Sequence, residues 1–420
     1  MFKLFSNAWK SKEVRNKILY TFLILAVVRL GAHIALPGID IVSVKQSIDS
    51  VSTGTLYNII AGGYNSNWSI FAMGIGPYIT SSIIMQLLTV AIPKLEQLSK
   101  EGEDGRKKIT NYTRYLTVVL ALIQAIGVTR SYRTMFIDTR MVTFILAIVM
   151  LVVSSTFVMW LAEQITAKGI SNGSSMIIFV NIVSNLPSGI QSLVYYGEGG
   201  AKTDIIKLIV MLVILLLDVI FIVLLHDGER RLPVQYSQKM LGRRTYGGQS
   251  SFMPIKISTA GVIAIIFAIS LLQFPQTVGQ FFHTGEKFQK LVDTLSMTNP
   301  VGAALYIILI ILFSYFYTSI VINPVEIAEN MKKNGGFIPG IRPGQPTSAY
   351  ITRVLNRVTF FGAISFAVIA MVPIALQWGF GFNVGFGGTT LIIVVGVCLD
   401  IVKNLESQLL MRHYKGFLSK

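Results

Sequence analysis

The chain has 420 residues, of which 52% are hydrophobic and only 13% are charged, and its formal net charge is +16. Soluble domains usually carry charge on about a quarter of their residues, so this composition excludes an ordinary water-soluble protein. The single cysteine, Cys398, excludes an internal disulfide, and its apolar surroundings predict a small buried residue.

Apolar runs dominate the chain from its basic start, MFKLFSNAWKSKEVRNK, onward. That start resembles a signal peptide, but no small-residue cleavage site follows it, so the first run is predicted to stay as a membrane span. A helix of roughly 20 apolar residues crosses a bilayer. The sequence therefore predicts an all-α membrane protein with ten spans, at residues 18–36, 69–92, 115–129, 142–164, 173–193, 205–225, 259–275, 301–322, 358–376 and 388–402.

A partly apolar segment, GTLYNIIAGGYNSN at residues 54–67, lies between the first two spans. It is too short to cross a membrane, and two glycines interrupt it. Its pattern is typical either of a re-entrant piece or of an ordinary outside loop, and irregular backbone at membrane depth requires protein or a watery cavity around it.

Isoleucines repeat at a spacing of four in two spans, as Ile79 and Ile83 in the second and as Ile178 and Ile182 in the fifth. Residues four apart lie on one face of a helix. A ring of such stiff aliphatic side chains can close a pore by excluding water. The alternative is plain packing against lipid or other helices.

The loop GFIPGIRPGQPT, which begins at Gly336, has three prolines and three glycines around Arg342. Proline fixes the backbone, so the pattern indicates a stiff loop rather than a simple connector. Its arginine offers a planar set of donors for a carboxylate or phosphate.

Most lysines and arginines fall in segments on the side of the N-terminus, and the exceptions are led by Arg130, Arg133 and Arg140. Because basic residues favour the cytoplasmic side, both termini are predicted to be cytoplasmic. The basic surface fits anionic lipid or a large acidic partner.

Ionisable residues within the spans are few, namely Arg29, His33, Lys207, Asp218, Glu163 and Asp400. A proton-driven solute transporter would need a series of membrane carboxylates, and an intramembrane enzyme would need a Ser–His, paired-Asp or metal set. The sequence contains neither pattern and no phosphate-binding loop. The residues therefore give little support to either alternative, and no cofactor or metal is predicted.

Motifs along nearly the whole chain resemble the SecY family of bacterial protein-export channels. They are NPVEIAENMKKNG followed by GFIPGIRPGQPT, and GIGPYITSSIIMQLL, EGEDGRKKITNYTRY, WLAEQITAKGISNG, RRLPVQYSQK, GRRTYGGQS and GGTTLIIVVGVCLD. The resemblance implies two pseudo-symmetric five-helix halves that form a clamshell. It places a cytoplasmic segment at 1–17, the halves at 18–200 and 201–402, cytoplasmic loops at 226–258 and 323–357, and a cytoplasmic tail at 403–420.

The resemblance also implies functional residues. A pore ring would contain Ile79, Ile83, Ile178, Ile182, Ile266 and Ile393. A short plug helix in segment 54–67 would contain Gly54, Leu56, Tyr57, Ile59, Ile60, Gly62 and Gly63. A lateral gate between spans two and three and spans seven and eight would contain Thr89, Gln124 and Ser270. The two cytoplasmic loops would bind partners through Arg243, Arg244, Arg342, Pro343 and Gly344.

The implied function is passage of unfolded secretory chains across the bacterial plasma membrane and sideways release of transmembrane segments into lipid, without enzymatic activity. The implied partners are the small subunits SecE and SecG, the SecA ATPase, the ribosome, the preprotein with its signal peptide, and anionic lipids.

Overall fold

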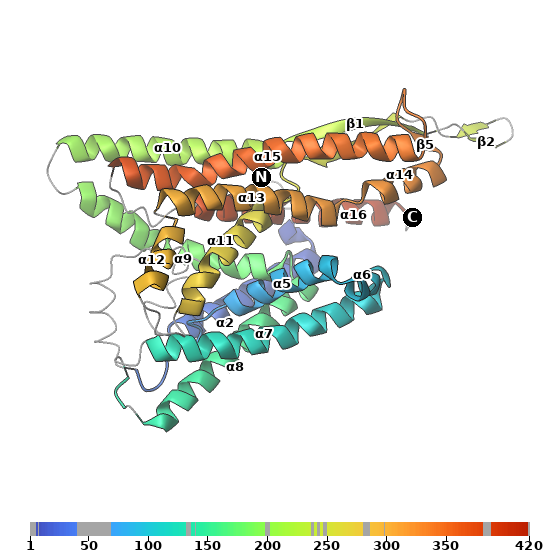
Figure 1. Ribbon diagram of the computed structural model, residues 1–420. Helices are drawn as coiled ribbons and strands as arrows, with labels where there is room; N and C mark the ends of the chain where they lie inside the picture. Colours follow the sequence, from blue (N-terminus) through green and yellow to red (C-terminus); the bar gives the residue numbers. More distant parts are fainter. Residues whose placement is uncertain are drawn as a thin grey trace.

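The computed structural model consists of long helices that run side by side, with a small β-sheet at one end (Figure 1). It describes residues 6, 8–39, 69–131, 136–138, 140–197, 202–236, 239–241, 244–246, 250–279, 286–297, 299–380 and 388–418.

Each predicted span overlaps a helix in this part of the chain, although the helix of the second span, predicted from residue 69, begins only at Gly76. The ten helices are α2 (Lys12–Ala32), α5 (Gly76–Ala91), α7 (Glu103–Ser131), α8 (Met141–Lys168), α9 (Gly173–Gly197), α10 (Lys202–Asp227), α11 (Gly261–Gly279), α13 (Pro300–Val321), α15 (Gln345–Phe380) and α16 (Gly388–Leu418). Three short helices join them, α6 (Pro93–Lys100), α12 (Glu286–Leu295) and α14 (Pro324–Lys333).

Several helices extend well beyond the apolar run that predicted them. Helix α7 begins at Glu103 and α15 at Gln345, whereas the predicted spans begin at residues 115 and 358. A helix satisfies its own backbone groups, so it continues into water after its apolar part ends. Within the described residues, five helices are by themselves long and apolar enough to cross a membrane, and the bent pair α5–α6 would make a sixth. Helices such as α2 and α16 carry several charged residues along their length.

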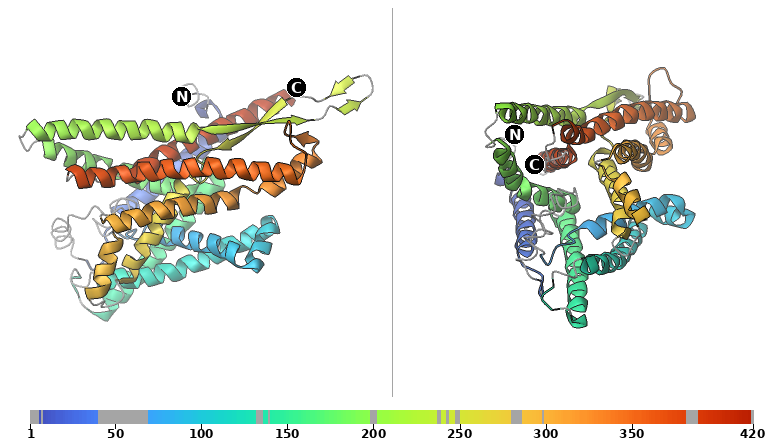
Figure 2. Two further views of the ribbon diagram at one scale, coloured as in Figure 1. Left: turned by 45° about the horizontal axis from the view of Figure 1, so that its top comes forward. Right: turned by 60° about the vertical axis from the view of Figure 1, so that its left-hand side comes forward.

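The helices form two sets with the same internal packing. The first set is α2, α5, α7, α8 and α9, and the second is α10, α11, α13, α15 and α16 (Figure 2). Five contacts between helices in the first set have a counterpart in the second: α5–α7 with α11–α13, α7–α8 with α13–α15, α8–α9 with α15–α16, α2–α8 with α10–α15, and α2–α9 with α10–α16. Because each set has five spans, an odd number, the second set begins on the opposite side of the membrane from the first.

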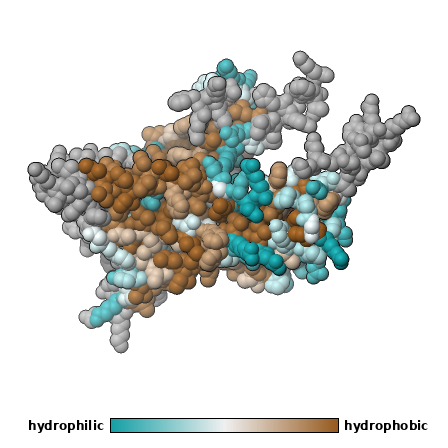
Figure 3. All heavy atoms as spheres, turned by 90° about the horizontal axis from the view of Figure 1, so that it is seen from above, coloured by the Kyte–Doolittle hydropathy of each residue, from teal (hydrophilic) through white to brown (hydrophobic). Residues whose placement is uncertain are grey.

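The surface of the helices is mainly apolar over a broad band, and the end that carries the sheet is more hydrophilic (Figure 3). Large apolar side chains on this band are exposed, for example Phe361 at 66% and Leu30 at 69%. Such a surface requires lipid around it. Cys398 is exposed on α16, so the prediction that it is buried was wrong. In a membrane protein, exposed positions and core positions are both occupied by apolar residues, so residue type alone does not distinguish an exposed position from a buried one.

The sheet joins two segments that lie far apart in sequence. Strand β1 (Glu229–Tyr236) pairs with β4 (Ser250–Lys256), and β5 (Gly336–Phe337) pairs with the end of β1, all antiparallel. A separate two-stranded ribbon is formed by β2 (Lys239–Leu241) and β3 (Arg244–Tyr246). These strands were not predicted, because the loops that contain them show no long alternation of apolar and polar residues.

Candidate functional site

The predicted ring isoleucines meet where the two helix sets join. Ile178 and Ile182 of α9 and Ile393 of α16 are buried in one hydrophobic cluster, at 3%, 0% and 2% exposure. Ile79 of α5 and Ile266 of α11 pack against the same cluster. Ile83 is buried in the neighbouring cluster, and Ile79 contacts both clusters. Five of the six predicted residues thus share one cluster, and Ile83 lies in the cluster beside it, while their role as a pore ring stays a prediction.

The helices that supply these isoleucines are counterparts in the two sets. Helix α5 corresponds to α11, and α9 corresponds to α16, according to the shared packing pattern. Each helix set thus supplies isoleucines to the junction from two helices that occupy matching places in the two sets. The side chains of these isoleucines offer no hydrogen-bond partner, so water placed among them would be unfavourable.

The predicted plug residues lie outside the described part of the chain, but both ends of their segment are anchored. Ala35 and Ser69 form an isolated β-bridge, and the Ile70 amide donates to the Ile34 carbonyl at 2.8 Å. The Ser154 hydroxyl of α8 donates to the Ile70 carbonyl at 2.6 Å. The segment therefore leaves α2 and returns beside the start of α5, the helix that carries Ile79.

The three predicted gate residues lie on the expected helices, at half-buried positions. Thr89 is on α5, Gln124 on α7 and Ser270 on α11. The Thr89 hydroxyl donates to the Met85 carbonyl on its own helix at 2.7 Å. Helices α7 and α11 contact each other across the boundary between the two sets. The lateral gate and the role of the three side chains in it stay a prediction.

The two predicted partner-binding loops form one folded unit. A hydrophobic cluster joins the hairpin to the second loop and its helices. It contains Leu232, Val234 and Ile255 from the hairpin and Met331, Ile338, Ile351 and Leu355 from the second loop region. The pairing of Gln235 with Phe337 and of Tyr236 with Gly336 adds backbone hydrogen bonds to this packing. The sheet and cluster hold the two loops in a defined relative position.

The loop around Arg342 is fixed by its backbone. Pro339 and Gly340 occupy the centre of a turn that the Ile341 amide closes by donating to the Ile338 carbonyl at 3.0 Å. Gly340 has φ of +81°, which suits the third residue of a type II turn. Ile338 is buried and Ile341 packs against the same cluster.

The side chain of Arg342 projects from this fixed base. The Arg342 carbonyl accepts a 2.9 Å hydrogen bond from the Thr347 hydroxyl, while the residue itself is exposed. Among the residues that the structure describes, the guanidinium has no ion-pair partner. Pro343 is exposed beside it, and Gly344 has φ of +104°, a backbone conformation that favours glycine. An exposed arginine on a stiff support loses little entropy when it binds a partner.

The other two predicted contact residues, Arg243 and Arg244, belong to the segment between β1 and β4. Arg244 begins strand β3, and Arg243 lies outside the described residues. Their role in binding stays a prediction.

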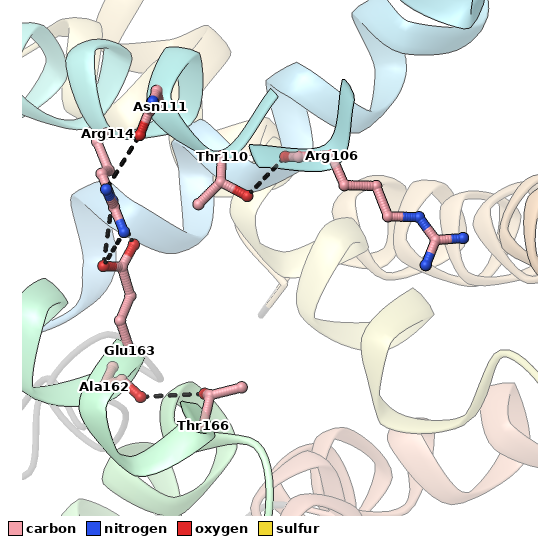
Figure 4. A network of polar contacts seen from close by, with 7 residues as sticks. All are labelled: Arg106, Thr110, Asn111, Arg114, Ala162, Glu163 and Thr166. Carbon is pink, nitrogen blue, oxygen red and sulfur yellow. Dashed lines mark hydrogen bonds and ion pairs between the residues drawn. The ribbon is translucent and has the colours of Figure 1, made fainter. Parts of the chain in front are cut away.

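An ion pair that the sequence analysis did not single out ties α7 to α8. The Arg114 Nε donates to both Glu163 carboxylate oxygens, at 2.9 and 3.1 Å, and Nη1 donates to the Asn111 side-chain oxygen at 3.0 Å (Figure 4). The Arg114 side chain is 45% exposed and the Glu163 side chain only 16%. Both residues lie within motifs that carried the resemblance, NYTRY and WLAEQ, and Glu163 is also one of the few ionisable residues within the predicted spans.

Replacing Arg114 with methionine is expected to destabilise the first helix set. The change leaves the Glu163 carboxylate unpaired, at a cost of about 1–3 kcal/mol for a buried acceptor, and partial exposure of the pair favours the lower part of this range. A lower melting temperature of the purified protein in detergent would verify it. Arg106→Met is the matched control, because this exposed arginine of α7 points away from the ion pair (Figure 4). Equal melting temperatures for the two variants would contradict the structural role of Arg114.

The class of protein follows from these features: a polytopic helical membrane protein whose two matching helix sets enclose an aliphatic junction. A family model described as SecY matches residues 69–402, and the chain belongs to the SecY family.

Curated relatives agree over their full length. "Protein translocase subunit SecY" of Streptomyces coelicolor is 42% identical over 441 residues and covers 100% of both chains. The protein of the same name from Halalkalibacterium halodurans is also 42% identical, with 100% of both chains covered.

Solved structures agree in fold. "The structure of a protein conducting channel" has a TM-score of 0.66 and 18% identity, and covers 94% of this chain and 91% of that chain. "Sec61 in the Canine ribosome-channel complex from the endoplasmic reticulum" has a TM-score of 0.60 and 17% identity, with the same coverage.

Proposed function

We propose that this protein is the channel-forming subunit of a protein translocase. Unfolded secretory polypeptides pass through it across the plasma membrane, and transmembrane segments leave it sideways into lipid. The observation that carries the proposal is the junction of the two helix sets, where isoleucines from α5, α9, α11 and α16 meet. The protein acts as a channel and catalyses no bond chemistry itself.

The six isoleucines serve as the closed constriction of the pore. Aliphatic side chains keep out water and ions, yet they part for chains of any sequence because they form no specific hydrogen bonds. The segment at 54–67 serves as the plug on the outer side. Contacts between the residues that flank this segment support the role, because Ala35 pairs with Ser69 and the Ile70 amide donates to the Ile34 carbonyl between α2 and α5.

The lateral gate opens between α5 and α7 on one side and α11 and α13 on the other. Support comes from the contact between α7 and α11, which lies at the boundary of the two sets. Separation of the sets at this boundary would connect the junction with lipid.

The sheet end of the molecule faces the cytoplasm, with both termini. Ala8, Val14 and Ile18 from the N-terminal segment pack with Leu405 from the C-terminal helix, which supports placement of both ends on one side. The excess of basic residues on this side supports a cytoplasmic orientation and contact with anionic lipids.

Partners of two kinds complete the translocase. SecE and SecG are small membrane subunits that assemble with channels of the SecY family. SecE closes the back of the two helix sets. SecA, which uses ATP, or a translating ribosome binds the folded unit that presents Arg342 and delivers the preprotein with its signal peptide. The solved Sec61 structure in a ribosome–channel complex supports the ribosome as a partner.

Reconstitution tests the proposed function. The protein, co-purified with SecE and SecG, is placed in proteoliposomes with SecA, ATP and a secretory precursor. ATP-dependent protection of the precursor from added protease is the expected result. A solute transporter would instead accumulate a small molecule without SecA, and an intramembrane protease would cleave the precursor. Absence of protection in the complete system would contradict the proposal.

Deletion of residues 57–65 is expected to raise the ion conductance of the resting channel while translocation continues. The plug seals the outer side, and the isoleucine constriction alone closes the pore less completely. Current through planar bilayers, measured with and without the deletion, is the relevant measurement. An unchanged resting conductance would remove this segment from the plug role.

A further inference from the structure

Two short helices occupy equivalent places in the two helix sets. Helix α6 contacts α5 and α7, and α12 contacts α11 and α13. Because α5 corresponds to α11 and α7 to α13, α6 and α12 are counterparts. They lie at opposite ends of the bundle, with α6 at the sheet end and α12 at the other end (Figure 1).

Helix α6 turns sharply away from the direction of α5. The two helix axes differ by 101°, and the break is at Ile92 and Pro93, where extended backbone precedes a new helix start. After such a bend α6 no longer follows the direction in which α5 crosses the bilayer. It therefore runs across the end of the bundle.

The two faces of α6 differ in polarity. Leu95 and Leu98, three residues apart, are half-buried on one face, whereas Gln97 is exposed. Glu96 and Lys100 form an exposed ion pair at 2.6 Å. At the break that leads into this helix, Val90 and Ile92 are 51% and 39% exposed, so apolar surface of α5 continues up to α6.

Helix α12 has the same division. Phe288, Leu291, Val292 and Leu295 follow the spacing of one helical face, and Lys290 and Thr294 are exposed on the other. Leu291 is 50% exposed, and its three companions are only half-buried. None of these four residues belongs to a hydrophobic cluster in the part of the chain that the structure describes.

We propose that α6 and α12 are a matched pair of interfacial helices, which lie on the inner and the outer surface of the membrane beside the lateral gate. Each rests its apolar face at the boundary between lipid headgroups and acyl chains and keeps its polar face in water. The assignment of inner and outer sides and of the gate rests on the proposed function.

The lipid surface is the occupant that both positions share. The two helices differ in sequence and lie at opposite ends of the bundle, yet both present an incompletely covered apolar face beside membrane-spanning helices. A protein partner at one end would leave the other face uncovered. The bilayer has an interface at each end and covers both. Each helix then anchors one pair of gate helices, α5 with α7 or α11 with α13, to one surface.

Site-directed spin labelling tests this arrangement. The exposed Cys398 is first replaced by serine, and single cysteines are introduced by Leu291→Cys and Leu98→Cys, with the matched polar-face controls Lys290→Cys and Gln97→Cys. Each spin-labelled channel complex is placed in nanodiscs of phosphatidylethanolamine and phosphatidylglycerol. Collision of the label with oxygen, which is concentrated in lipid, is compared with collision with a water-soluble nickel complex.

Labels at Leu291 and Leu98 are expected to retain oxygen collisions and to lose nickel collisions, while labels at Lys290 and Gln97 show the reverse. Equal access to nickel at the leucine and control positions would overturn the proposal, since both faces would then lie in water. Loss of both kinds of collision at the leucines would also overturn it, because their face would be buried in protein. Translocation measured on the same variants separates this result from failure of the channel function itself.

Discussion

Arg342→Glu is expected to reduce SecA-driven translocation about tenfold or more while the channel stays folded. Loss of one partner of an interfacial charge pair typically costs about 2 kcal/mol or more, and about 1.4 kcal/mol corresponds to a factor of ten. The fold should tolerate the change, because the described contacts of this residue are made by its backbone. Surface substitutions of this kind alter stability by about 0.5 kcal/mol or less.

The measurement pairs a translocation assay with a melting curve of the same purified complex. Lys333→Glu is the matched control, since it makes the same charge reversal at an exposed position in the last turn of α14. Equal loss of translocation in both variants would assign the effect to general surface charge. Unfolding of the Arg342 variant would make this residue structural and would contradict the docking role.

Ile393→Asn is expected to relax the selection of signal sequences, so that precursors with defective signals are exported better. The substitution places an amide in the apolar junction with Ile178 and Ile182. A buried polar group without a partner costs about 1–3 kcal/mol in the closed state, and wetting of the open state removes this cost. A difference of 1–2 kcal/mol shifts the ratio of open to closed channels by roughly 5–30-fold.

Ile392→Asn is the control for this experiment. Ile392 is adjacent and equally buried, at 1% exposure, but it lies in the other hydrophobic cluster, which consists mainly of residues from the second helix set and also includes Ile83. Its substitution should lower the melting temperature without improving export of defective precursors. Export is measured with a signal-defective precursor in cells that contain each variant. Equal export in the two variants, or stricter selection by the Ile393 variant, would argue against the constriction.

The positions of the spans were predictable from the sequence because the bilayer imposes a simple requirement. Each crossing needs about 20 apolar residues, and the ten predicted runs overlap ten helices among the described residues. The ends were not predictable to the same degree. The first helical turns of α7 and α15 are polar and lie before the apolar run, so hydrophobicity does not show where these helices begin.

The candidate site depended on more than apolar pattern. Ile79 and Ile83, or Ile178 and Ile182, have the same spacing whether they face a pore, a neighbouring helix or lipid. The resemblance to a family selected them, and the structure brings them to one junction with Ile266 and Ile393. Cys398 shows the limit of residue type alone, because it is exposed although its apolar sequence context predicts a buried position.

The sequence by itself determined the membrane spans, the basic side of the molecule and the stiffness of the loop around Arg342. These properties depend on local composition and on the backbone limits of proline and glycine. Only the tertiary structure decided that this loop joins the 229–256 hairpin in one sheet, that Arg114 pairs with Glu163, and that α6 and α12 are counterparts. Each of these involves groups separated by tens of residues, and such contacts depend on how the helices pack in space, which local pattern does not encode.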